Sequence, residues 1–291
     1  MSKKVVPALI ALVIALAWLC SAFVPFPVFA IIVGIVAAIA VYEVENAIGM
    51  KFKPIQIITM LYAAAGPIVA NFINKINFPF AAVTTLFVVT ILILMVIKHD
   101  KNKFQTVATS VFASICLSYG FSTVVLIRDL YTTYADVFSN KKPYAVFFLL
   151  LSFFCAWMTD AMAFFAGSFF GKHKMCPKIS PNKTIEGAIG GVLSNAILTL
   201  ILLTIFRHFF DVQVGYLFTA LVSIVLSVVS IFGDLAASVI KRQSGIKDFG
   251  NLIPGTGGIM DRFDSALFVL PLLYGIIKVC IENGASNFIF S

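Results

Sequence analysis

Residues 215–240 read GYLFTALVSIVLSVVSIFGDLAASVI, and Asp234 is the one charged residue among them. A helix crosses the hydrocarbon layer of a bilayer with about 20 apolar residues, so this stretch is long enough to span a membrane. The same pattern recurs along the chain, with apolar runs of similar length separated by short polar connections. The runs lie at 5–24, 29–50, 55–74, 79–97, 105–127, 144–166, 184–206, 215–240 and 259–281.

The composition agrees with this pattern. The 291 residues are 60% hydrophobic and only 12% charged, with a mean hydropathy of +1.03. A soluble domain is less apolar and about twice as charged, so a soluble enzyme, a disordered chain and a disulfide-stapled secreted domain are excluded. The sequence therefore predicts an all-α, polytopic integral membrane protein with about nine transmembrane helices. We expect five spans in residues 1–143 and four in a catalytic region, 144–291.

The cysteines indicate no disulfide framework and no zinc site, and the net charge does not require a nucleic-acid partner. None of the five cysteines forms a CxxC pair, and four lie in apolar runs, where a free thiol packs as a small hydrophobe. The net charge of +8 fits the Lys/Arg excess of cytoplasmic loops. With the N-terminus in the cytoplasm, 15 Lys and Arg residues fall on that side and five outside. The five are Lys75, Arg128, Lys141, Lys142 and Arg207.

Ionisable residues within or at the ends of the apolar runs are the candidate functional residues, because placing them in a membrane is costly. They are Asp160, Glu186, Asp234, Asp261 and Asp264. Asp234 comes 18 residues after Tyr216, or ~27 Å along a helix, which is close to the far side of a ~30 Å core. Asp261 begins the next run, so we expect it at a similar depth on the cytoplasmic side.

Helical spacing groups these acids with other polar side chains. Asp234, Ser238 and Lys241 share one helical stripe. Asp261, Asp264 and Ser265 are spaced to share one face of the following helix. Two carboxylates from neighbouring helices at one depth suit Mg²⁺, which binds one or two carboxylates together with substrate phosphates.

Two basic loops face the same side as these acids. Residues 241–258 combine cations with a glycine-rich stretch whose N–H groups can approach phosphate oxygens. Residues 171–187 carry further lysines, a predicted turn at Ser180-Pro181, and Thr184 as a predicted helix cap. Carboxylates for a metal beside cations for phosphates favour phosphoryl or nucleotidyl transfer.

The segment Ser238-Val239-Ile240-Lys241-Arg242, with Lys247-Asp248 and residues 254–265, PGTGGIMDRFDS, resembles the phosphatidate cytidylyltransferase (CDP-diacylglycerol synthase) family. The signature of that family is S-x-x-K-R-x4-K-D-x-G-x2-[IL]-P-G-H-G-G-x2-D-R-x-D. Residues 160–167, 179–187 and 233–234 are also similar to family motifs. Thr256 stands where the family usually has His, and Phe164 where it often has Tyr.

The resemblance implies an enzyme that joins CTP to phosphatidate, giving CDP-diacylglycerol and pyrophosphate. It implies Mg²⁺ as cofactor, with Asp234 and Asp261 as its ligands, and leaves open a second metal ion. The expected partners are CTP, phosphatidate and membrane lipid, a second copy of the chain in a homodimer, and no nucleic acid. The expected location is the bacterial inner membrane, with the N-terminus and active site cytoplasmic.

On this interpretation one group of side chains neutralises or hydrogen-bonds phosphates during catalysis, and another binds substrate. The first group is Lys241, Arg242, Lys247, Arg262 and Ser238. The second is Lys183, Ser180, Asp160, Glu186, Asp248, Gly255, Gly257, Gly258 and Asp264. The alternatives are another membrane lipid transferase, a polytopic transporter and a non-catalytic lipid-binding scaffold. The D-x2-D-G-x2-A-R motif of transferases using CDP-linked donors is absent, as is any repeat of the kind that transporters show.

Overall fold

The computed structural model describes residues 26–73, 80–101, 103–252 and 257–290. The chain divides into two compact units, each described here by itself. Unit 1 comprises Met1–Leu126 and Gln243–Phe263, and unit 2 comprises Ile127–Arg242 and Asp264–Ser291. The predicted boundary at residue 143 separates N-terminal spans from a catalytic region, and it stays a prediction. The boundaries of the two units, which are defined by contacts between residues, lie at other positions.

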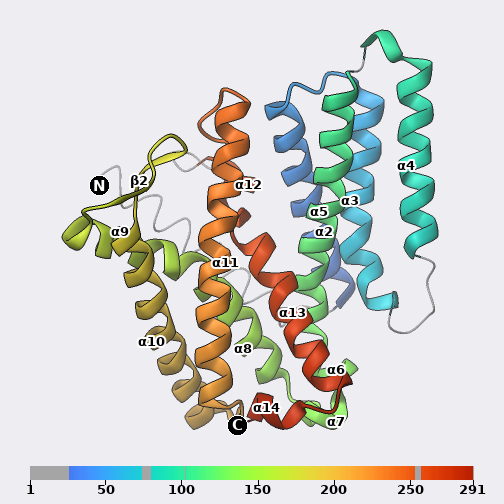
Figure 1. Cartoon of the computed structure of the whole chain (residues 1–291). Helices are drawn as coiled ribbons and strands as arrows, with labels where there is room; N and C mark the ends of the chain where they lie inside the picture. Colours follow the sequence, from blue (N-terminus) through green and yellow to red (C-terminus); the bar gives the residue numbers. More distant parts are fainter. Residues whose placement is uncertain (1–25, 74–79, 102, 253–256, 291) are drawn as a thin grey trace. The chain divides into compact units, whose positions relative to one another are not determined.

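Unit 1 is built from membrane-length helices (Figure 1). They are α2 (Phe26–Ala47), α3 (Lys53–Ile73), α4 (Phe80–Ile97) and α5 (Phe104–Arg128), with the 3₁₀ turn η1 (His99–Lys101) and the short helix α12 (Met260–Phe263). Gly34 lets α2 approach α3 closely, because a Cβ there would lie 2.6 Å from the carbonyl oxygen of Ala64. Tyr62 of α3 stacks on Phe87 of α4 with ring centroids 4.0 Å apart.

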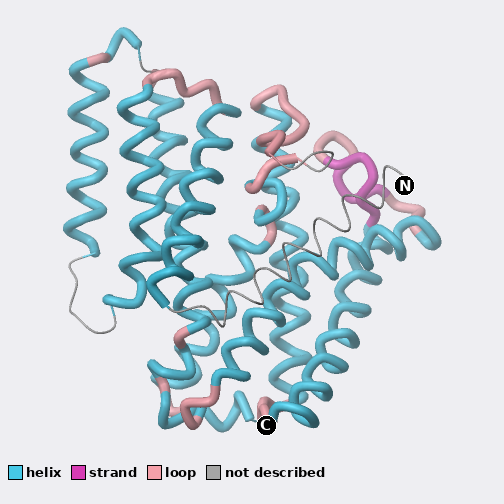
Figure 2. Tube along the Cα trace, turned by 180° about the vertical axis from the view of Figure 1, so that it is seen from behind, coloured by secondary structure: helices cyan, strands magenta, loops and turns pink. Residues whose placement is uncertain are grey.

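Unit 2 contains the other long helices and the two strands of the described chain (Figure 2). Its elements are α6 (Leu130–Thr133), α7 (Ala135–Phe138), α8 (Lys142–Phe153), the π-helix η2 (Phe154–Met158), α9 (Thr159–Phe170), β1 (Lys174–Cys176), β2 (Ser180–Thr184), α10 (Ile185–Phe210), α11 (Tyr216–Gln243), α13 (Ala266–Glu282) and α14 (Ser286–Phe290). The strands form an antiparallel hairpin in which Lys174 pairs with Thr184 and Cys176 with Ser180. The predicted turn at Ser180-Pro181 is wrong, because these residues begin β2.

Small residues allow α9 and α10 to pack closely. A Cβ at Gly187 would lie 2.7 Å from the carbonyl oxygen of Ala163, and one at Gly191 would lie 2.8 Å from that of Thr159. Helices in lipid associate through such small residues, because close backbone approach gains van der Waals contact. This packing brings Asp160 of α9 near the start of α10.

Seven helices of the described residues are long and apolar enough to span a membrane, and they coincide with seven of the predicted runs. They are Pro27–Ala47, Lys53–Ala70, Phe80–Ile97, Phe104–Arg128, Lys142–Phe170, Ile185–Phe210 and Tyr216–Gln243. The predicted first span, 5–24, lies outside the described residues. The predicted single helix over 259–281 is wrong: it divides into α12 and the 17-residue α13.

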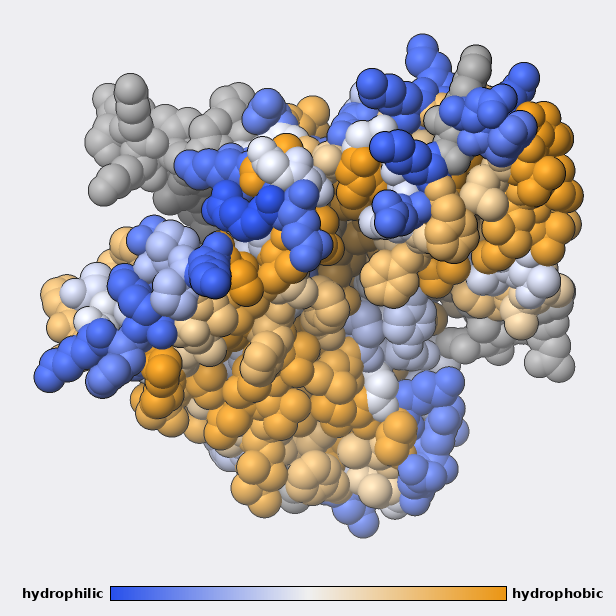
Figure 3. Space-filling view, turned by 45° about the horizontal axis from the view of Figure 1, so that its top comes forward, coloured by the Kyte–Doolittle hydropathy of each residue, from blue (hydrophilic) through white to orange (hydrophobic). Residues whose placement is uncertain are grey.

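Hydrophobic residues cover much of the face shown in Figure 3, and hydrophilic residues gather in patches, mainly along its upper and left parts. On α10, for example, Ile189, Leu193, Ile197 and Ile201 are all more than half exposed. They recur every four residues and form one apolar stripe. In water such a stripe would be unfavourable, whereas in a bilayer it faces lipid tails.

Membrane orientation is testable by labelling. In a background with the five native cysteines replaced by Ala, we expect cysteine at Lys101 or Asn251 to react with an impermeant maleimide only from the cytoplasmic side. Cysteine at Asn140 should react only from outside. The reason is the unequal distribution of Lys and Arg between the two sides. The reversed labelling pattern would contradict the orientation.

Candidate active site

A pocket of about 300 Å³ lies in unit 2 where α9, β2, α10 and α11 meet. Its polar lining comes mainly from residues that the sequence singled out, and its remaining walls are small or apolar side chains. The lining residues are Asp160, Ala163, Phe164, Met175, Ser180, Asn182, Lys183, Thr184, Gly187, Ala188, Ile231 and Asp234. One pocket is therefore lined by four predicted site residues that come from three separate stretches of the sequence: Asp160, Ser180, Lys183 and Asp234.

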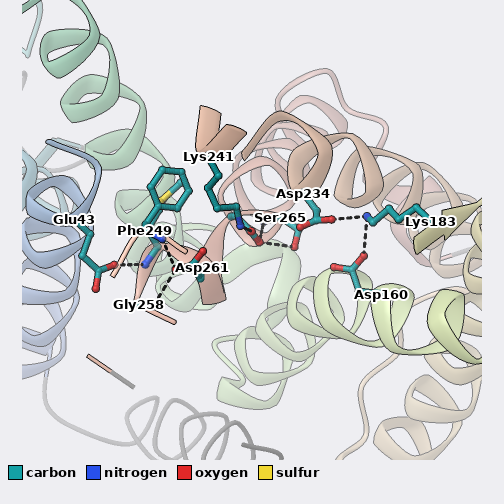
Figure 4. A network of polar contacts seen from close by, with 11 residues as sticks. Glu43, Asp160, Lys183, Asp234, Lys241, Phe249, Gly258, Asp261 and Ser265 are labelled. Atoms are coloured by element: carbon teal, nitrogen blue, oxygen red, sulfur yellow. Dashed lines mark hydrogen bonds and ion pairs between the residues drawn. The ribbon is translucent and has the colours of Figure 1, made fainter. Parts of the chain in front are cut away.

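Lys183 is the centre of this charge cluster (Figure 4). Its Nζ lies 2.5 Å from Asp234 and 3.4 Å from Asp160, and its side chain is 22% exposed. Burial by itself lowers the pKa of Lys183, but the two carboxylates outweigh burial and hold the pKa above its usual value of 10.5. The lysine therefore stays charged at any physiological pH.

The local fold directs Lys183 into the pocket. It lies near the end of β2, and the next residue, Thr184, accepts a 3.1 Å hydrogen bond from the N–H of Gly187. This confirms the predicted cap of α10 and sets where the strand ends. Glu186, in the first turn of α10, accepts hydrogen bonds from the N–H groups of Lys172 and His173 and contacts His173 Nδ1 at 2.5 Å. Glu186 thus holds the hairpin instead of lining the pocket.

The stripe of Asp234, Ser238 and Lys241 lies on α11 as predicted. Lys241 Nζ lies 3.6 Å from Asp264, which is only 5% exposed and also accepts a 2.8 Å hydrogen bond from the N–H of Ser265. Two lysines and three carboxylates therefore form ion pairs within unit 2. Arg242 is exposed and donates from Nε to the carbonyl of Ile179 at 3.4 Å.

Asp261 lies in unit 1 and organises the loop that precedes it. Its Oδ2 accepts hydrogen bonds from the N–H groups of Phe249 at 2.8 Å and Gly258 at 2.9 Å. Gly257 has a φ of +89°, and a Cβ there would lie 2.8 Å from the same oxygen. A glycine is therefore required at this position both by conformation and by space.

The remaining predicted residues of unit 1 differ in exposure. Lys247 and Asp248 are exposed, Arg262 is half-buried and Gly258 is buried. Gly255 and Thr256 lie outside the described residues.

The predicted shared face of Asp261, Asp264 and Ser265 is wrong, because α12 ends at Phe263 and α13 begins at Ala266. Asp234 and Asp261 belong to different units, so their pairing stays a prediction.

Glu43 is a buried acid that was not among the residues predicted from the sequence. This residue lies in α2, is 6% exposed, and accepts hydrogen bonds from the N–H groups of Ile259 at 3.1 Å and Met260 at 2.8 Å. Its position in the sequence could have identified it, because Glu43 is an acid inside the predicted apolar run 29–50 and such acids are candidate functional residues. Glu45, two residues further on, is equally buried and accepts instead from Thr59 Oγ1 of α3 at 2.8 Å.

Two carboxylates of unit 2 lie close enough together to hold one cation. Oxygens of Asp160 and Asp234 approach one ammonium group from two helices, so both can contact one cation. Among the described residues, no group of three or more His, Cys, Asp or Glu side chains could hold a metal ion.

Comparison with known proteins identifies the class. Residues 2–280 match the cytidylyltransferase family, so the chain belongs to this family of nucleotidyltransferases. It is similar to proteins named phosphatidate cytidylyltransferase: 35% identical to one from Bacillus subtilis over 72% of this chain and 71% of that protein. It is 34% identical to one from Staphylococcus aureus over 94% and 97% of the two chains. The predicted resemblance is confirmed, and the transporter alternative is not supported.

Replacing Lys183 tests the charge cluster. We expect Lys183→Met to lower kcat/KM on the order of 10²-fold or more, because two partly buried carboxylates lose the cation that they share. Lys178→Met is the control, since Lys178 is exposed on the same hairpin and should change kcat/KM little. Equal losses of kcat/KM in both variants would contradict the role given to Lys183 in the charge cluster.

The pH dependence follows from the raised pKa of Lys183. A raised lysine pKa keeps the ion pairs formed below its ordinary value of 10.5, and they are lost only as the pH rises through the higher folded-state value. The wild-type rate should therefore show no loss assignable to Lys183 as the pH rises from about 6 to 9. Rates of wild type and Lys183→Met over this range check the expectation: a loss at rising pH that occurs in the wild type and not in the variant would contradict it.

Proposed function

We propose that the chain transfers the cytidylyl group of CTP to phosphatidate in a bacterial membrane, releasing pyrophosphate and forming CDP-diacylglycerol. Family membership and the names of the relatives support this reaction. The structural observation that carries the proposal is a charged pocket adjacent to an apolar groove, both within unit 2. A substrate with an anionic head and acyl tails has the same two parts.

The apolar groove lies between α10 and α11 and has a volume of about 270 Å³. It shares Met175, Ala188 and Ile231 with the charged pocket, so the two are adjacent. The rest of its lining is wholly apolar: Ile189, Val192, Leu193, Val228 and Phe232. We place the phosphate of phosphatidate near Lys183 and one acyl chain along this groove.

The reaction needs positioning and charge neutralisation more than a general base. An oxygen of the phosphatidate phosphate attacks the α-phosphorus of CTP, forming a new P–O bond as the bond to the pyrophosphate oxygen breaks. The nucleophile is already anionic near neutral pH, so no proton must be removed from it. Lys183 and Lys241 supply positive charge within unit 2, and their carboxylate partners hold the two ammonium groups in place.

Asp234 and Asp261 are the carboxylates that we propose to hold Mg²⁺, which when bound would neutralise triphosphate oxygens. Asp160 lies next to Asp234 around Lys183 and is a further candidate ligand. Arg242, Lys247 and Arg262 are proposed to contact phosphates. A homodimer with a cytoplasmic active site also belongs to this proposal.

The proposed metal ligands are tested together. With purified protein, CTP and phosphatidate, we expect Asp234→Asn and Asp261→Asn to lose on the order of 10²-fold or more in the rate of pyrophosphate release, because each loses a charge and a hard-ion ligand. Asp248→Asn should be milder, since that side chain is exposed in the loop.

The measurement is a rate series against Mg²⁺ concentration for the three variants and the wild type. Wild-type protein that releases no pyrophosphate from CTP and phosphatidate would refute the proposed function. Full activity with unchanged Mg²⁺ dependence in either the Asp234 or the Asp261 variant would remove that residue from the metal site.

The groove is tested by filling it. We expect Leu193→Trp to raise the KM for long-chain phosphatidate several-fold, because the indole occupies space proposed for the acyl chain. The KM for CTP should not change, and dihexanoyl phosphatidate should be affected less. Ile197→Trp is the control, since Ile197 is exposed one turn further along α10 and does not line the groove. Identical kinetics in both variants would place the acyl chain elsewhere.

A further inference from the structure

Two carboxylates on α2 point in different directions. Glu43 and Glu45 are two residues apart, about 200° around a helix, so they face opposite sides. Both are buried, at 6% and 0% exposure. Glu45 accepts a hydrogen bond from Thr59 on α3, whereas Glu43 accepts from the N–H groups of Ile259 and Met260. Only Glu43 contacts the segment that carries Asp261.

The contacts of Glu43 fall where α12 begins. The first N–H groups of a helix have no partner within it, and here the two oxygens of one carboxylate accept one each. Such charge-assisted hydrogen bonds are stronger than neutral ones and are directional. They define where α12 starts relative to α2, and therefore where the next residue, Asp261, is placed.

Two glycines of the loop make room for this carboxylate. A Cβ built at Gly258 would collide with both oxygens of Glu43, and one at Gly250 would collide with Oε1. Neither glycine has a positive φ. The space taken by Glu43 thus explains these two glycines, whereas the positive φ and the Asp261 carboxylate explain Gly257.

The other side of α12 is also held. Phe263 packs edge-to-face on Phe121 of α5, with ring centroids 5.4 Å apart. Asp261 Oδ2 in turn accepts from Phe249 and Gly258. One connected set of contacts within unit 1 therefore joins Glu43, α12 and the loop residues Phe249 and Gly258 (Figure 4).

From these contacts we infer that Glu43 is a positioning residue for the cytidylyl transfer: it fixes the start of α12 and thereby aims the Asp261 carboxylate. Glu43 acts through the loop and touches no substrate. The kinetic part of this inference rests on the proposed function, whereas the hydrogen-bonding part does not. The two parts are therefore measured separately.

The test compares Glu43→Gln with Glu45→Gln by hydrogen–deuterium exchange and by kinetics. The amide in Glu43→Gln retains one acceptor oxygen, but its NH₂ group faces the second N–H donor. Exchange in the peptide covering 257–263 should speed up in Glu43→Gln and stay unchanged in Glu45→Gln. The kcat should fall by about tenfold or more in Glu43→Gln, as expected for one lost charge-assisted hydrogen bond, with little change in KM. Glu45→Gln should keep its kcat.

A double-substitution cycle keeps the inference testable if Glu43→Gln folds poorly. Gly258→Ala should lower kcat strongly in the wild type, because its methyl group collides with the Glu43 carboxylate. It should cost much less in a Glu43→Ala background, where that carboxylate is gone. Additive effects, or unchanged exchange at 257–263 in Glu43→Gln, would overturn the inference. If Glu43→Gln shows the expected change in exchange but the wild-type protein has no turnover, the proposed function is refuted instead.

Discussion

A carboxylate buried in an apolar helix must meet hydrogen-bond donors or a cation, because the cost of removing its charge from water is otherwise uncompensated. This constraint organises the polar parts of both units. In unit 2 it joins α9, β2 and α11 through Lys183, and it joins α11 to the turn before α13 through Lys241. In unit 1 it ties the start of α12 to α2 through Glu43.

The same partnerships prepare unit 2 for phosphate chemistry. An ammonium group shared by two carboxylates is charged and fixed in position before any substrate arrives, so little reorganisation is needed during the reaction. An apolar groove lies beside this cluster, and it is the site that we propose for an acyl chain. The adjacency of these two surfaces follows from the close packing of α9 on α10, which depends on Gly187 and Gly191.

Much of the fold and part of the site were predictable from sequence. Seven spans were located to within a few residues, because length and hydrophobicity decide which segments a bilayer can hold. The cap at Thr184 and the stripe of Asp234, Ser238 and Lys241 are local patterns, and they were also predicted correctly. The division of 259–281 into α12 and α13 was missed, because hydrophobicity does not reveal a break when both halves are apolar.

By itself, the sequence determined that the chain is a multi-pass membrane protein of the cytidylyltransferase family, since composition and a long motif are properties of the linear chain. Only the tertiary structure decided which partner each charged side chain has. Glu43 and Met260 are more than 200 residues apart, and Asp160 and Asp234 meet at Lys183 from separate elements. Such pairings depend on how helices pack and rotate about their axes, and no local spacing encodes them.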